Sequence, residues 1–94
     1  MSVSRPYENV FDALEDDPVI ADNLRIRSEM MIRLRNYIER EGISQGEAAR
    51  RMGVSLSCIN NLKHGEIDRL TTDLLIGMLS RVDIRVEVVL KQAA

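Results

Sequence analysis

Residues 44–65 constrain the fold of this 94-residue chain more than any other stretch, because capping and turn residues alternate there with apolar residues at helical spacing. Ser44 is placed to cap a first short helix, and Glu47, three residues later, completes a capping box. Gly53 can supply a tight turn, Ser55 can cap a second helix, and Gly65 can end that helix. The pattern predicts two short helices joined by a sharp turn.

The apolar residues of this stretch fall where two crossing helices would bury them. Ala48 and Met52 share one face of the first helix, and Ile59 and Leu62 give the second helix an inward face. Val54 lies at the corner between the helices. This joint register predicts a helix-turn-helix that docks on DNA through its second helix. The alternative is an ordinary helical hairpin that serves packing alone.

Three more helices are predicted around this motif, which gives a mainly α, five-helix fold. Residues 9–14 predict one short helix, Asp17 followed by Pro18 begins a long helix to about Glu41, and a cap formed by residues 71–73 begins a last helix that ends near residue 82. The long helix carries an apolar stripe that is interrupted at Arg27 and consists of Ile20, Leu24, Met31, Leu34 and Ile38.

Residues 84–91 alternate apolar with mostly polar side chains, which is the pattern of a β-strand. No other segment offers a partner strand, so the simplest partner is the same strand of a second copy, paired antiparallel in a homodimer. The alternatives are an extension of the last helix, a frayed terminus, and addition of the strand to a different protein. The apolar dimerisation row is Ile84, Val86, Val88 and Leu90.

Composition bounds the class of protein. The length suits one domain, and with two Tyr, one Phe and no Trp its core must be aliphatic and rich in methionine. A single cysteine excludes an internal disulfide framework, and the absence of a secretory segment or an apolar run of about eighteen residues predicts a soluble, cytoplasmic protein.

We divide the chain into an acidic segment (1–16), a helix-turn-helix domain (17–82) and a C-terminal dimerisation strand and tail (83–94).

The formal net charge of −2 is distributed unevenly. Residues 1–23 hold one basic and six acidic side chains, whereas residues 24–94 hold twelve basic and nine acidic side chains. The basic excess suits DNA binding by a dimer, which doubles the local positive charge. A solvated surface of mixed charge explains part of the same excess.

Residues 44–65 resemble the Xre and Cro-like repressor family. Together with residues 9–14 and 84–88, they give a wider pattern that is similar to HigA-type antitoxins of toxin-antitoxin pairs. The resemblance implies a small dimeric DNA-binding protein that neutralises a RelE/HigB-like ribonuclease toxin. It also implies repression of the shared operon through an inverted-repeat operator in double-stranded DNA.

The resemblance also implies roles for residues of the motif. Gln45, at the start of the first motif helix, is expected to contact phosphate, and Asn60 and Asn61 face base edges, where an amide can pair with adenine. For the basic residues, ordinary surface charge is the alternative, and His64 can instead complement the negative end of its helix. The candidate DNA contacts are Gln45, Arg50, Arg51, Ser55, Leu56, Ser57, Asn60, Asn61, Lys63 and His64.

The acidic N-terminal segment is the candidate toxin-binding surface. Its carboxylates would attract a basic ribonuclease, and its apolar residues could anchor the complex. A tail that merely aids solubility is the alternative. The candidate residues are Val10, Phe11, Leu14, Asp16 and Asp17.

The residue inventory argues against an enzyme. Cys58 and His64 are the only cysteine and histidine, and six residues apart on one helix they point to different faces, so they cannot form a nucleophile and base pair. No metal-ligand spacing or glycine-rich phosphate loop is present, and no cofactor is expected. The competing functions are a stand-alone phage or plasmid-type repressor and a protein-interaction module without specific DNA binding.

Overall fold

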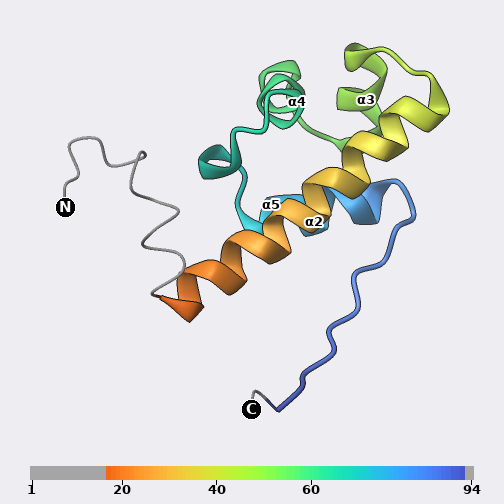
Figure 1. Cartoon of the computed structure of the whole chain (residues 1–94). Coiled ribbons are helices and arrows are strands. Elements are labelled where there is room, and N and C mark those ends of the chain that lie inside the picture. The colour runs from red at the N-terminus through yellow and green to blue at the C-terminus, as the bar shows by residue number, and fades with distance from the viewer. Residues whose placement is uncertain (1–16, 93–94) are drawn as a thin grey trace, which may run out of the picture.

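A computed structural model describes residues 17–92 of the chain. Its elements are α2 (Pro18–Glu41), α3 (Gln45–Met52), α4 (Leu56–Lys63), the short 3₁₀ helix η1 (Ile67–Arg69) and α5 (Thr72–Arg81) (Figure 1). The mainly helical class is confirmed for this part of the chain. The short helix expected at residues 9–14 lies outside the described residues, so four of the five expected helices are found here, and η1 was not expected.

Side chains at the predicted positions cap the N-termini of the four α-helices. Asp17 accepts from the backbone N–H of Val19 at 3.0 Å, in front of the proline that opens α2. Ser44, Ser55 and Thr71 each accept from the backbone N–H three residues later, which satisfies an otherwise unpaired donor. The helix boundaries are therefore decided by local chemistry.

Two glycines end helices where a side chain would be strained. Gly42 closes α2 with φ 62°, and Gly53 closes α3 with φ 69°. Both lie in the left-handed region that glycine adopts without steric cost. The chain can thus reverse direction after α2 and again between α3 and α4.

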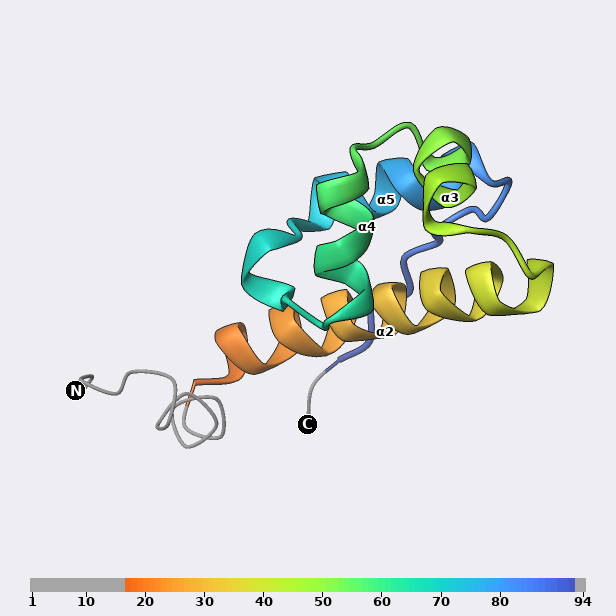
Figure 2. The same ribbon diagram turned by 90° about the horizontal axis from the view of Figure 1, so that it is seen from above.

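The long helix α2 forms the base on which α4 and α5 pack, and α3 packs against α4 and α5 (Figure 2). The core lies between them and is aliphatic and rich in methionine, as expected. No polar or charged side chain among the described residues is buried in it. The buried residues are Met30, Met31, Leu34, Ala48, Ala49, Met52, Ile59, Leu62, Leu70, Leu75, Met78, Leu79 and Val82.

The stripe predicted on α2 is buried only in the middle of the helix. Met31 and Leu34 are in the core, whereas Ile20 is 42% exposed, because the shorter helices do not cover the first turns of α2. Arg27, the expected interruption, lies against the η1 segment, where its side chain hydrogen-bonds to backbone carbonyls.

The C-terminal β-strand is not formed in the single chain. Asp83, with φ 64°, breaks the helix, and residues 84–92 continue without regular secondary structure. Ile84 and Val86 pack against the core, but Val88 is 77% exposed and Leu90 is 89% exposed. A strand needs a neighbour for its backbone hydrogen bonds, and residues 17–92 provide none for this segment.

Candidate nucleic-acid interface

Helices α3 and α4 form the helix-turn-helix that the sequence predicts. Ala48 and Ala49 are buried where α3 meets α4, and their small side chains let the helices approach closely. The turn is closed by hydrogen bonds from the Gly53 N–H to the Arg50 carbonyl at 3.3 Å and from the Val54 N–H to the Ala49 carbonyl at 3.0 Å. The turn residues therefore fix the angle between the two helices.

One side of α4 is anchored and the opposite side is open. Ile59 and Leu62 are buried in the core, whereas Leu56 is 55% exposed and Ser57 and Asn60 are also exposed. Asn61 is half-buried at the edge of this outer face. The first turn of α4 thus presents hydroxyl, amide and apolar groups on a rigid helix, which is the arrangement needed to contact base edges in a major groove.

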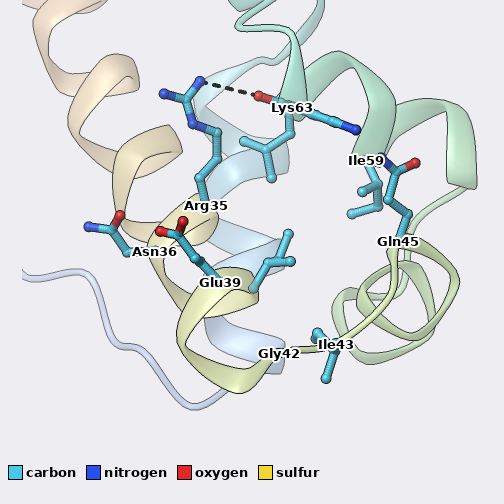
Figure 3. A pocket seen from close by; sticks show the side chains of 10 residues that line it. Arg35, Asn36, Glu39, Gly42, Ile43, Gln45, Ile59 and Lys63 are labelled. Carbon is cyan, nitrogen blue, oxygen red and sulfur yellow. Dashed lines mark hydrogen bonds between the residues drawn. The ribbon is translucent and has the colours of Figure 1, made fainter.

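A groove of about 660 Å³ lies between the C-terminal part of α2, the start of α3 and the C-terminal half of α4 (Figure 3). Arg35 and Lys63 bring positive charge to its lining, and Asn36 and Gln45 bring amides. Glu39 adds one carboxylate. The apolar part of the lining consists of Ile38, Ile43, Ile59 and Leu62.

Arg35 is oriented by the end of α4. Its Nη1 donates to the backbone carbonyl of Leu62 at 3.5 Å, the contact drawn as a dashed line in Figure 3. The remaining guanidinium donors and the Lys63 ammonium can reach an anion in the groove. Motif spacing did not single out Arg35 or Asn36, because they lie on α2, outside the motif, and reach the groove only through the fold.

The two arginines at the end of α3 belong to an ion-pair network centred on Glu47. Arg50 Nε donates to Glu47 at 3.0 Å, and Arg51 donates to Glu47 at 2.9 Å, to Glu41 at 3.0 Å and to the Tyr37 hydroxyl at 3.1 Å. Hydrogen bonds from Arg50 and Arg51 lower the pKa of Glu47 to about 2. Hydrogen bonds to Glu47, Tyr37 and Glu41 raise the pKa of Arg51. Arg51 therefore ties α3 to α2.

The residues at the end of α4 divide between two roles. His64 Nδ1 lies 2.9 Å from the carbonyl oxygen of Asn60, so its ring complements the negative end of the helix. Lys63 is exposed and lines the groove. Ser55, which caps α4, places its hydroxyl 3.1 Å from the Cys58 N–H.

Cys58 faces the protein interior and not the outer face of α4. It is half-buried, its sulfur lies 4.0 Å from that of Met78, and burial raises the pKa of its thiol. This environment makes the thiolate unfavourable.

Metal sites, membrane-spanning helices and the candidate toxin-binding residues can be assessed only within the part of the chain that the structure describes. Residues 17–92 contain no group of three or more metal-ligating side chains that could hold an ion, and no helix there is long and apolar enough to cross a membrane. Of the candidate toxin-binding residues, only Asp17 is described, as the cap of α2. The others, Val10, Phe11, Leu14 and Asp16, lie outside the described residues.

Comparison with known families agrees with this geometry. The model of a family described as a helix-turn-helix domain matches residues 13–91, which is nearly the whole chain. No curated protein matches the sequence. The exposed first turn of α4 is the part of such a domain that suits a DNA-binding regulator. The chain belongs to this helix-turn-helix domain family.

Proposed function

We propose that this protein is a sequence-specific DNA-binding repressor that reads base edges with α4. One observation carries the proposal: α4 is buried along Ile59 and Leu62 while Leu56, Ser57 and Asn60 are exposed at its start. A helix held in this way can enter the major groove without losing its packing. Ser57 and Asn61 are the residues we expect to contribute most to base recognition.

We expect the phosphate backbone of the DNA to lie in the groove between α2 and α4. Gln45 is the first residue of α3, where backbone N–H groups favour a phosphate, and Lys63 lines the same groove. Arg50 and Arg51 share Glu47, so we expect them to contribute less to phosphate binding than Lys63.

We propose that the protein binds DNA as a homodimer joined through residues 84–91. A dimer would present two copies of α4 roughly 34 Å apart, which matches successive major grooves of an inverted repeat. Val88 and Leu90 support this proposal because they are exposed apolar residues. They end the row whose first two members, Ile84 and Val86, are partly buried against the core.

The resemblance to HigA-type antitoxins supports a second role in the cytoplasm. We propose that the protein neutralises a cognate RelE/HigB-like ribonuclease toxin and represses the operon that encodes both. The acidic excess of residues 1–23 complements the basic surface expected of a ribonuclease.

DNA binding is tested by a fluorescence-anisotropy titration of the full chain against its own upstream DNA and a shuffled control. Asn61→Ala should weaken specific binding about tenfold, as expected for loss of one bidentate base contact. Gln92→Ala, an amide-to-alanine change on an exposed residue beyond the proposed dimerisation segment, is the matched control and should leave affinity unchanged. Equal weak binding to both DNAs, insensitive to Asn61→Ala, would favour a protein-interaction module.

The toxin proposal is tested separately with the product of a neighbouring gene of ribonuclease type. Removal of residues 1–16 should abolish the affinity for this toxin while specific DNA binding persists. Unchanged toxin affinity would exclude the acidic segment as the binding surface. DNA binding without any toxin partner would favour a stand-alone repressor.

A further inference from the structure

The C-terminal segment has one half that is covered by its own subunit and one half that is not. Ile84 and Val86 are partly buried against the core, Arg85 and Glu87 between them are exposed, and Val88 is 77% exposed. The side chains of residues 84–87 therefore already alternate between core and solvent as in a strand. Beyond Val86 the apolar row continues with side chains that the core of the same subunit does not cover.

The backbone of this segment is available for pairing. Its last hydrogen bond to the rest of the described chain runs from the Ile84 N–H to the Leu79 carbonyl at 2.9 Å. Figure 1 shows the segment leaving α5 and its last described residues running away from the helices. An extended segment with apolar side chains and unpaired peptide groups favours addition of another strand.

We propose that two copies pair antiparallel along residues 84–88 in one register, which places Arg85 opposite the partner's Glu87. This inference rests on the proposed homodimer and specifies its contacts. The two-fold axis passes at Val86, so each Arg85 meets a Glu87 and the two ion pairs are equivalent. Ile84 then lies opposite the partner's Val88, on the face that packs against the core.

Charge selects this register over its neighbours. Opposite residues of an antiparallel pair project from the same face of the ribbon, so a shift that opposes the apolar row to the charged row is excluded by the pattern. If the two-fold axis passed at Glu87, the Glu87 side chains of the two copies would lie opposite each other. If it passed at Arg85, the two Arg85 side chains would lie opposite each other. Like charges directly opposite each other are destabilising.

The same register covers Val88, the first exposed residue of the apolar row. Val88 of each copy lies beside Ile84 of the other, which is already packed on a core, so it gains an apolar neighbour that its own subunit lacks. Neither charged residue has an ion-pair partner among the described residues of its own chain. Both are therefore available to the second copy.

The experiment is a charge exchange on the full chain, measured by sedimentation equilibrium without DNA. Arg85→Glu opposes two glutamates at both ends of the ribbon, and Glu87→Arg opposes two arginines. Each variant should weaken the dimer about tenfold, because two attractive cross-strand pairs become repulsive. Both positions are exposed, so the helical fold should persist in circular dichroism.

Restoration provides the decisive measurement. The double variant Arg85→Glu/Glu87→Arg should regain the dimer affinity of the original chain. An equimolar mixture of the two single variants should form a heterodimer, since one copy then carries two acids and the other two bases. Arg69→Glu, the same charge change on an exposed residue of η1, is the control and should not alter association.

The outcomes separate the register from the proposed function. Dimers that form but ignore both reversals would overturn the register while the homodimer stands. A chain that remains monomeric at every concentration reached would overturn the ribbon itself, whereas recognition by α4 is tested independently with Asn61→Ala. Weakening by both single variants without restoration in the double variant would also overturn the pairing of Arg85 with Glu87.

Discussion

Arg27 donates a hydrogen bond from its Nη1 to the backbone carbonyl of Ile67 at 2.9 Å, although the two residues lie 40 positions apart in the sequence. The same nitrogen reaches the carbonyl of Leu70 at 3.3 Å, and Nε donates to Asn23 at 2.9 Å. One guanidinium on α2 thus binds the connection that follows α4. It stabilises the segment through which α4 joins α5.

Replacement of this arginine should therefore destabilise the fold. Arg27→Met removes the donors to two partly buried carbonyls, and we expect a loss of about 1–3 kcal/mol in the free energy of unfolding. Arg25→Met is the control, because its ion pairs with Asp22 and Glu29 are exposed and should contribute less than about 1 kcal/mol. Urea denaturation measures both, and equal losses would contradict the structural role of Arg27.

Gly53 and Gly77 provide opposite tests of glycine replacement. Gly53 has φ 69°, and a Cβ there would lie 2.8 Å from Nε of Arg81, so Gly53→Ala should cost about 1–2 kcal/mol. Gly77 lies inside α5 with no atom within 4 Å of the added Cβ, and Gly77→Ala should stabilise the helix by about 0.5–1 kcal/mol. Thermal unfolding should show melting temperatures that move in opposite directions. A higher melting temperature for Gly53→Ala would contradict the left-handed conformation of Gly53.

Two serines at the start of α4 should separate folding from DNA binding. Ser55→Ala removes the cap on the Cys58 N–H and should cost about 1 kcal/mol of stability. Ser57→Ala changes an exposed side chain, so its effect should appear in DNA affinity and stay within about 0.5 kcal/mol for unfolding. Chemical denaturation and anisotropy on the same preparations give the comparison. A large stability loss in Ser57→Ala would place that residue in the fold and not on the DNA surface.

The Glu47 network predicts a pH dependence of stability. Hydrogen bonds from Arg50 and Arg51 lower the pKa of Glu47 from an ordinary 4.5 to about 2 in the folded protein. The carboxylate therefore adds stability that is fully present above pH 4.5 and is lost as the pH falls toward 2. Glu47→Gln should lower the melting temperature near pH 6, and the difference from the original chain should shrink between pH 4.5 and 2. A constant difference across this range would contradict the network.

Local chemistry made the helices predictable. The sequence predicts caps at Asp17, Ser44 and Ser55 and a fourth within residues 71–73, because a cap needs only backbone donors two or three residues away. The structure confirms the first three and places the fourth at Thr71. The inward faces of α3 and α4 follow from helical periodicity in the same way. The expected DNA-facing residues at the start of α4 remain predictions, with their exposure now known.

Long-range contacts are the part of this structure that sequence patterns do not reveal. By its position Arg27 only interrupts an apolar stripe, because its carbonyl partners lie far along the chain. The contacts of Arg51 with Tyr37 and Glu41 depend on how α3 lies relative to α2, and its expected contact with DNA remains a prediction. Arg35 enters the groove for the same reason. None of these relationships has a spacing that a motif could reveal.

The sequence by itself determined where helices begin and end, which faces are apolar and that residues 84–88 have the pattern of a strand, since these depend on interactions within a few residues. Only the tertiary structure decided which arginines join distant segments, how the groove beside α4 is built, and that Ile84 and Val86 pack against the core while Val88 and Leu90 are exposed. The physical reason is that hydrogen bonds and ion pairs between distant segments form only once the core has fixed the helices in space.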